Sequence, residues 1–135
     1  MKISHTPKTF VIDAGGKILG RVATVATEAL RGKNDPNFER HEMSGNTVIV
    51  LNMKDIQLSG NKLEAKEYFH HTRYPGGLRR TTAKEIMEKN PSDLMRRAVH
   101  GMLPKNKLRE RFMKNLLILN DDAYQKTKND IELKA

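Results

Sequence analysis

The sequence AVHGMLPKNKLRER, residues 98–111, is the stretch that decides how this chain is organised. A helix leads into it, because apolar residues recur at the spacing of one buried helix face, at Leu94, Met95, Ala98, Val99 and Met102. The opposite face of that helix carries Arg96, Arg97 and His100. Pro104 ends the helix, since proline has no N–H to donate and its ring clashes with the preceding turn.

A second short helix is predicted after Pro104, because Leu108, Phe112 and Met113 recur at helical spacing. Five cations are interspersed with these apolar residues, namely Lys105, Lys107, Arg109, Arg111 and Lys114. The stretch therefore predicts two short helices at an angle, each with an apolar face toward the core and a cationic face toward solvent. Such a corner suits a surface that bends around a phosphate backbone.

The excess positive charge is concentrated in one third of the chain. The 135 residues carry a formal net charge of +9, with an isoelectric point of about 9.9. Residues 71–115 contain twelve Lys and Arg against four Asp and Glu, whereas residues 1–70 contribute only +2 and residues 116–135 contribute −1. Clustered cations are the electrostatic signature of a nucleic-acid binder. The alternative is a basic protein whose charges are merely solvated.

Several protein classes are excluded by what the sequence lacks. The absence of cysteine excludes disulfides, thiolate zinc sites and cysteine nucleophiles. No run of 18 apolar residues is present, so neither a membrane span nor a membrane partner is expected. The N-terminus lacks the apolar core of a signal peptide, which predicts a cytoplasmic location. The length predicts one domain over residues 1–135, with an N-terminal extension at 1–8 and a polar, partly frayed tail at 120–135.

The first half of the chain predicts a strand, a helix and a second strand. Thr9–Asp13 is a run of β-formers, and a helix follows over Ile18–Leu30, with Gly32 just past its end. Thr47–Asn52 is continuously apolar, which predicts a strand covered on both faces, as in a parallel sheet.

The glycine turn between the first strand and the helix does not form a nucleotide-binding fingerprint. Gly15, Gly16 and Gly20 do not make G-x-G-x-x-G, and no G-K-[ST] is present. The turn is therefore interpreted as a site of close helix–strand packing, and no cofactor is predicted.

Weaker patterns predict the remaining elements, which are a loop at Asn34–Gly45, a short strand at Ile56–Ser59, a turn at Gly60–Lys62 and a last strand at Leu116–Leu119. Thr82-Ala83-Lys84-Glu85 has the form of a capping box and begins a helix that ends near Asn90. Pro91 fits the first turn of the helix that leads into residues 98–111.

Residues 66–80 interleave aromatic, histidine and cationic side chains and include Pro75-Gly76-Gly77, where glycine lets the backbone approach a partner closely. The rings of Tyr68, Phe69 and Tyr74 could stack on bases, but rings in a strand more often belong to the core. His70 and His71 point to opposite faces of a strand, and no carboxylate lies beside them at metal-ligand spacing. Neither a metal site nor a catalytic residue is predicted.

Segments across the chain resemble a known family. They are residues 11–14 with 16–21 and 30–33, residues 48–52 with 60–62, residues 68–72 with 74–78, and residues 98–106. The chain resembles, over residues 8–120, the family of the thirteenth protein of the large ribosomal subunit in its bacterial form. Two stretches depart from the family pattern. Residues 106–111 replace the usual Gly-Pro-Leu-Gly-Arg, and residues 121–125 replace a histidine-rich C-terminal motif.

The resemblance implies an α/β fold, a three-layer α/β/α sandwich around a small, mainly parallel sheet of about four strands. It also implies a structural constituent of the large ribosomal subunit that binds large-subunit (23S-type) rRNA and acts early in subunit assembly. The expected partners are that rRNA, neighbouring large-subunit ribosomal proteins and, as a further role of the family, the protein's own mRNA, whose translation it would repress. No homo-oligomer is expected.

Function on this interpretation is mainly electrostatic, because Lys and Arg release condensed counterions when they neutralise phosphates. The strongest RNA-binding candidates are Arg73, Arg79, Arg80, Arg96, Arg97, Lys105, Lys107, Arg109, Arg111 and Lys114. A second group comprises His70, His71, Arg21, Arg31, Lys33, Lys62 and Lys66. For each of these residues, a solvated surface charge is the alternative.

Two other functions are alternatives to the ribosomal one. An RNA-modifying or nucleotide-using enzyme would need a cofactor loop or an acid–base pair, and the sequence contains neither. A free-standing RNA-binding chaperone or translational repressor would share the cationic surface, but it would not remain with large subunits through moderate salt.

Overall fold

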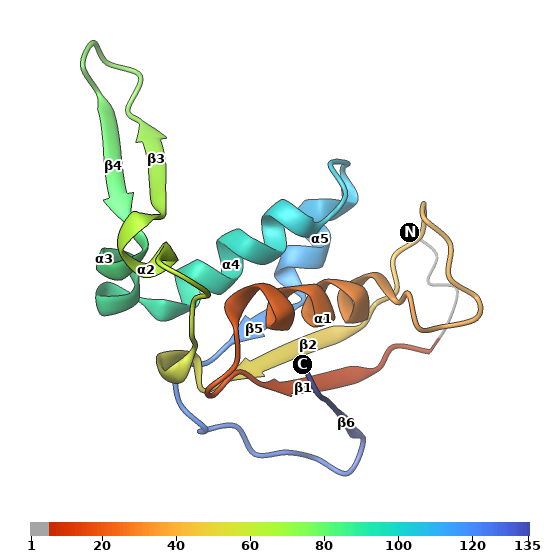
Figure 1. Cartoon of the computed structure of the whole chain (residues 1–135). Coiled ribbons are helices and arrows are strands. Elements are labelled where there is room, and N and C mark those ends of the chain that lie inside the picture. The colour runs from red at the N-terminus through yellow and green to blue at the C-terminus, as the bar shows by residue number, and fades with distance from the viewer. Residues whose placement is uncertain (1–5) are drawn as a thin grey trace.

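The computed structural model describes residues 6–135, so the first five residues of the predicted N-terminal extension lie outside the described part (Figure 1). The elements follow in the order β1 (Thr9–Asp13), α1 (Leu19–Arg31), β2 (Thr47–Leu51), the 3-10 helix η1 (Met53–Asp55), α2 (Lys62–Ala65), β3 (Glu67–His71), β4 (Leu78–Thr82), α3 (Ala83–Lys89), α4 (Pro91–Met102), α5 (Leu108–Lys114), β5 (Leu116–Ile118) and β6 (Asp130–Leu133).

Four strands form a parallel sheet in the order β5-β2-β1-β6, and β3 and β4 form a separate antiparallel hairpin. In the middle of the sheet Thr9 lies beside Thr47, and four consecutive residues of β2, from Val48 to Leu51, are buried. This confirms the interpretation of the continuous apolar run as a strand covered on both faces. The α/β class with a small, mainly parallel sheet of four strands flanked by helices is therefore confirmed, and it is consistent with the expected layered sandwich.

The two faces of the sheet are covered by different parts of the chain. Phe10, Ile12, Val48 and Val50 belong to the larger apolar cluster, which includes residues of α1, α4 and α5. Figure 1 shows these three helices on one side of the sheet. The alternate side chains Val11, Ile49 and Leu51 form a second cluster, and the residues packed against it are Leu119 and Tyr124.

The helix boundaries follow the local signals closely. α1 ends at Arg31, and Gly32 takes a left-handed conformation with φ of 74°, which glycine adopts without a steric penalty. The Thr82 hydroxyl accepts a hydrogen bond from the Glu85 amide at 3.3 Å, and this is the predicted N-cap of α3. Pro91 occupies the first position of α4, as predicted.

The apolar face of α4 is shorter than predicted. Leu94, Met95 and Val99 are buried, whereas Ala98 is only half-buried and the Met102 side chain is 44% exposed. The prediction of a buried Met102 is therefore wrong. Met102 lies in the last turn of α4, where the side chain borders an open groove and not the core.

The strand predicted at Ile56–Ser59 is also wrong. Within this segment only Gln57 forms a β-bridge, with Ile18. The Gln57 amide donates to the Lys17 carbonyl, and its carbonyl accepts from the Leu19 amide, both at 2.9 Å. These two backbone hydrogen bonds to the start of α1 hold the segment in place, so a longer strand pairing is not needed.

The polar tail contributes an edge strand that the sequence analysis did not predict. β6 pairs in parallel with β1, with Asp130 beside Thr9. The Asp130 carboxylate accepts hydrogen bonds from the Tyr124 hydroxyl and from the amide and hydroxyl of Thr127, each at 2.9 Å. These bonds lower the pKa of Asp130, the amide of Thr127 making the largest contribution.

Asp130→Ala is expected to loosen β6 without unfolding the rest of the sheet. The substitution removes three hydrogen bonds that hold the start of this strand, and hydrogen exchange of the β6 amides should become faster while the β2 amides stay protected. Asp122→Ala, in the same segment, serves as the control and should leave exchange unchanged. Equal protection of β6 in the two variants would contradict this role.

The same carboxylate predicts a pH dependence. Because the pKa of Asp130 in the folded chain lies below its ordinary value of 3.8, the stabilisation is complete above pH 3.8 and is lost as the pH falls through the lower folded-state pKa. Exchange in β6 should therefore accelerate below pH 3.8, relative to β2, in the parent chain but not in Asp130→Ala.

Candidate nucleic-acid interface

The β3–β4 hairpin projects from the body of the molecule (Figure 1). Glu67 pairs with Thr82 at its base, and His71 pairs with Leu78 near its tip. All residues of β3 are exposed except the half-buried Tyr68, and the outer three residues of β4 are also exposed. An isolated two-stranded hairpin buries too little apolar surface to be stable by itself, so the structure presents a ribbon whose two faces are both open to a partner.

The pairing register distributes the candidate side chains over both faces of this ribbon. Phe69 lies beside Arg80 on one face, and His70 lies beside Arg79 on the other. His70 and His71 therefore point to opposite faces, as expected from the alternation of a strand. Arg79 and Arg80, which are adjacent in the sequence, therefore point to opposite faces of the ribbon.

The tip of the hairpin has a defined geometry. The Thr72 amide donates to the Gly77 carbonyl, and the Gly77 amide donates to the Tyr74 carbonyl, both at 2.9 Å. Arg73 has a positive φ of 67°, and its amide donates to Nδ1 of His71 at 2.8 Å. The Arg73 side chain is thus carried on a tight turn and not on a loose loop.

The aromatic side chains of this region have two different environments. Phe69 is 58% exposed and Tyr74 is 74% exposed, so a core role is wrong for both rings. The Arg80 guanidinium lies 5.6 Å from the centre of the Phe69 ring. These two rings lie on the outer part of the ribbon, where there is no core to enter. Strand propensity alone does not predict that these rings are exposed. The cationic residues on both sides of Phe69 in the sequence were the feature that could have predicted it.

Tyr68, by contrast, is half-buried and packs against the larger apolar cluster. The charged groups of Arg97 and Lys66 lie 5.2 Å and 5.8 Å from the centre of its ring. Burial raises the pKa of the Tyr68 phenol, so the ring stays neutral at physiological pH. Tyr68 therefore joins the base of the hairpin to α4 and holds two of the candidate cations beside each other.

The outer face of α4 carries both cations and anions. Arg96 is exposed, whereas Nε of Arg97 donates to the Asp93 carboxylate at 2.9 Å. Nε2 of His100 lies 3.8 Å from the Glu110 carboxylate of α5. Asp93 was expected only to complement the N-terminal dipole of this helix, and Glu110 had no expected role; in the structure both restrain part of the cationic surface.

The corner between α4 and α5 presents the remaining candidates of the opening stretch. Arg109 is half-buried, and the exposed members are Lys105, Lys107, Arg111 and Lys114. The hairpin joins the molecule near the start of α4, and this corner lies at its end (Figure 1). Twelve helical residues span roughly 18 Å. A nucleic-acid strand that contacts both regions must therefore run along α4.

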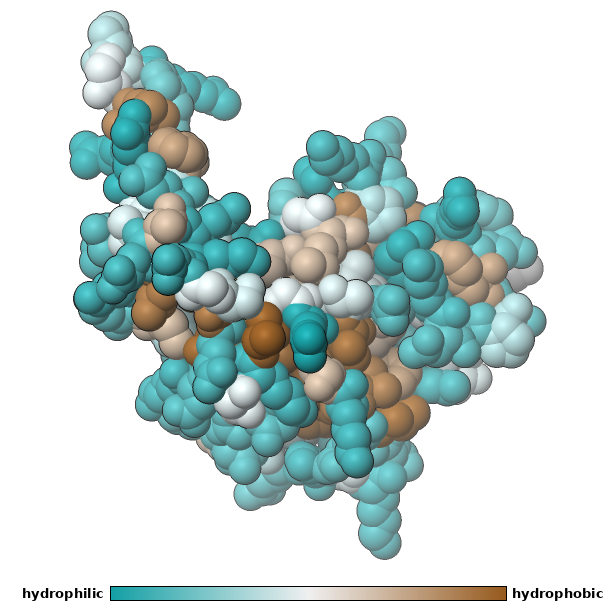
Figure 2. Space-filling model, viewed as in Figure 1, coloured by the Kyte–Doolittle hydropathy of each residue, from teal (hydrophilic) through white to brown (hydrophobic). Residues whose placement is uncertain are grey.

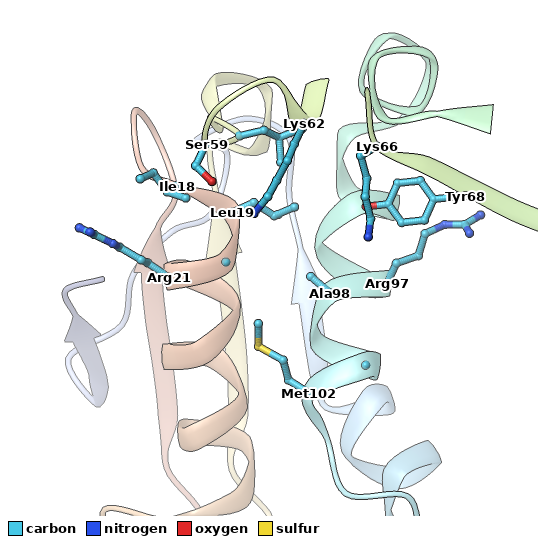
Figure 3. Close-up of a pocket in the computed structure, with 13 residues that line it drawn as sticks. Ile18, Leu19, Arg21, Ser59, Lys62, Lys66, Tyr68, Arg97, Ala98 and Met102 are labelled. Atoms are coloured by element: carbon cyan, nitrogen blue, oxygen red, sulfur yellow. The ribbon is translucent and has the colours of Figure 1, made fainter. Parts of the chain in front are cut away.

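A groove between α1 and α4 brings together four candidates from separate parts of the sequence, Arg21, Lys62, Lys66 and Arg97. Its volume is about 510 Å³. Figure 3 shows the Lys62 and Met102 side chains pointing into the space between the two helices, with Lys66 and Arg97 beside Tyr68. The Arg21 side chain points away from α4 in the same view.

Arg31 and Lys33 are not part of this arrangement. They lie at the C-terminal end of α1, and the groove is lined by residues of its first turn. The Arg31 guanidinium lies over the Phe38 ring, 5.5 Å from its centre. These two candidates would contact a nucleic acid at a place distinct from the hairpin and the groove.

Among groups of three or more His, Asp or Glu in the described residues, Glu39, His41 and Glu42 lie close enough to share a metal ion. Nε2 of His41 lies 3.1 Å from Glu39 and 3.8 Å from Glu42. This group lies in the loop between α1 and β2, and Glu39 and His41 are exposed, which is the ordinary state of solvated charges. Within residues 6–135, the helices are too short or too polar to cross a membrane.

Gly77→Ala is expected to disturb the tip of the hairpin while leaving the core intact. An added Cβ would collide with the Thr72 side chain and lie 2.8 Å from the Tyr74 carbonyl oxygen. Amide chemical shifts at the tip should change, and the global free energy of unfolding should change by less than about 0.5 kcal/mol, because the tip of the ribbon does not pack on the core. Pro75→Ala is the control at the tip. A large loss of global stability would show that the hairpin supports the core.

Comparison with known proteins gives a consistent result. The family model for ribosomal protein L13 matches residues 7–125. The large ribosomal subunit protein uL13 of Spiroplasma citri is 50% identical over 111 residues, which are 82% of this chain and 76% of that protein. The proteins of the same name from Geobacter sulfurreducens and Clostridioides difficile are each 47% identical, over 81% and 82% of this chain and 76% and 78% of their own lengths. The chain therefore belongs to the ribosomal protein L13 family.

Proposed function

We propose that this chain is a structural constituent of the large ribosomal subunit, acting on ribosomes in the cytoplasm, and that it binds large-subunit rRNA directly. The family match makes it a structural ribosomal protein and not an enzyme. The finer roles, an early step in subunit assembly and repression of its own mRNA, belong to the same proposal because both would use one RNA-binding surface.

The observation that carries the rRNA proposal is the exposed hairpin. Phe69, Tyr74 and Leu78 expose large apolar side chains beside Arg79 and Arg80. Figure 2 shows hydrophobic surface on the hairpin surrounded by hydrophilic residues. Such surface is unfavourable in water. It is useful on a ribbon that places rings against bases and cations against phosphates of folded RNA.

The proposed surface extends from the hairpin along α4 to the α4–α5 corner. Arg96, Arg97 and His100 occupy the intermediate positions. Because the hairpin and the corner lie at opposite ends of one helix, the surface fits a folded RNA more naturally than a short single strand. Neighbouring ribosomal proteins are proposed as the other partners, at surfaces that the RNA leaves free.

In-cell cross-linking of the tagged chain, with sequencing of the attached RNA, tests the proposal directly. Reads concentrated on a few sites of large-subunit rRNA are expected, and reads on the chain's own message would support the repressor role. Reads scattered over messages and transfer RNAs would instead favour a free-standing RNA-binding factor. Sedimentation in moderate salt separates the same alternatives, since a ribosomal constituent stays with large subunits.

The double variant Arg79→Ala with Arg80→Ala tests the hairpin in vitro. Affinity for deproteinised large-subunit rRNA should fall, and the slope of log K against log salt should decrease by about 0.7–0.9 for each lost phosphate contact. Lys128→Ala with Lys134→Ala removes the same charge from the tail and is the matched control. An equal loss in both double variants would mean that net charge alone drives binding.

A further inference from the structure

We infer that the groove between α1 and α4 holds one unstacked nucleotide of the bound RNA. Its base lies between the two helices, and its phosphate lies beside Lys62 and Lys66. This inference rests on the proposed function, and it assigns a specific site on the RNA-binding surface. Two glycines, the lining of the groove and its position support this site.

Two helical glycines line the groove without a reason inside the chain. Gly20 lies in the first turn of α1 and Gly101 in the last turn of α4, and glycine inside a helix is less favourable than alanine by up to about 1 kcal/mol. Neither has a positive φ, and apart from the neighbouring residues and the backbone of its own helix, a Cβ at either position would meet no described atom within 4 Å. Since neither backbone conformation nor internal packing requires glycine here, close approach of an external partner accounts for both.

The lining of the groove matches the chemistry of a nucleotide. Leu19, Leu58, Ala98 and Met102 supply an apolar surface on which a base can lie, and Figure 2 shows hydrophobic surface in the region between the helices. Lys62, Lys66 and Arg97 supply cations at one side, and the lining residues include no Asp or Glu. The volume of about 510 Å³ is within the range of small-ligand sites, which is roughly 300–1,000 Å³.

The position of the groove favours a nucleotide of the bound RNA over a peptide. The charged groups of Lys66 and Arg97 lie 5.8 Å and 5.2 Å from the centre of the Tyr68 ring, so the groove is continuous with the base of the hairpin and with the cationic face of α4. An RNA that follows α4 would pass the opening of this groove. Unstacked bases of folded RNA are the usual targets of side-chain recognition, and one such base would fix the register of the RNA on this surface.

Gly101→Leu tests the groove without changing any charge. The leucine should fill the space that the base would occupy, and the variant should fold at least as well as the parent because leucine favours a helix. Affinity for deproteinised large-subunit rRNA should fall by about tenfold, the effect of losing one base contact, with an unchanged salt slope. Ala123→Leu adds the same side chain in the segment beside Tyr124, which covers the opposite face of the sheet, and serves as the control.

Titration of the ¹⁵N-labelled chain with UMP, AMP and inorganic phosphate separates a nucleotide site from a simple anion site. The nucleotides are expected to shift the Gly20 and Gly101 amide signals at millimolar concentration, and in Gly101→Leu the shift of the Gly20 signal should be abolished. Equal shifts with phosphate alone would overturn the assignment of the base. Parent-like rRNA affinity of Gly101→Leu would overturn the inference and leave the groove to a protein partner.

The two proposals can fail separately. If the parent chain binds no rRNA, the proposed function fails, while the UMP titration still decides whether the groove takes a nucleotide. If rRNA binding depends on Arg79 and Arg80 but not on Gly101, the proposed function stands and the nucleotide site is rejected.

Discussion

The parallel pairing of β1 with β2 is the constraint on which the rest of the structure depends. Two parallel neighbours need a crossover connection, and α1 supplies it by packing on one face of the sheet. The side chains of β1 and β2 alternate between two apolar clusters, so the register of this pair decides what each face of the sheet buries. With α1 fixed, α4 packs beside it and the groove between the two helices is defined.

The division between a buried face and a charged face organises the surface in turn. α4 buries Leu94, Met95 and Val99 in the larger cluster, and this orients Arg96 and Arg97 outward. Pro104 stops the helix so that the chain can turn, and Leu108 and Phe112 attach α5 to the same core. The cations of residues 96–114 are thus carried on a rigid corner, which would lower the entropy lost if they bind RNA as proposed.

The hairpin, in contrast to α4 and α5, is not anchored by a row of buried side chains. It has almost no core of its own, and its attachment relies on Tyr68 at one side and on the capped start of α3 at the other. An element of this kind adds little to the stability of the free chain and leaves nearly all of its side chains to a partner. Phe69, Tyr74 and Leu78 have no core to enter, which is why the composition of the hairpin looks unlike that of the sheet strands.

The sequence by itself determined the central strands, α1, α3, α4 and α5. The signals that define these elements, which are hydrophobic periodicity, capping residues and prolines, each act over only a few residues of the chain. It also identified the family from local motifs. Other features depend on contacts between distant segments. The β6 strand exists through Asp130 and the edge of β1, and the exposure of Met102 depends on what α1 leaves open. The meeting of Lys62, Lys66 and Arg97 around one groove was likewise decided only by the tertiary structure, because no local pattern records which surfaces the packed helices leave uncovered.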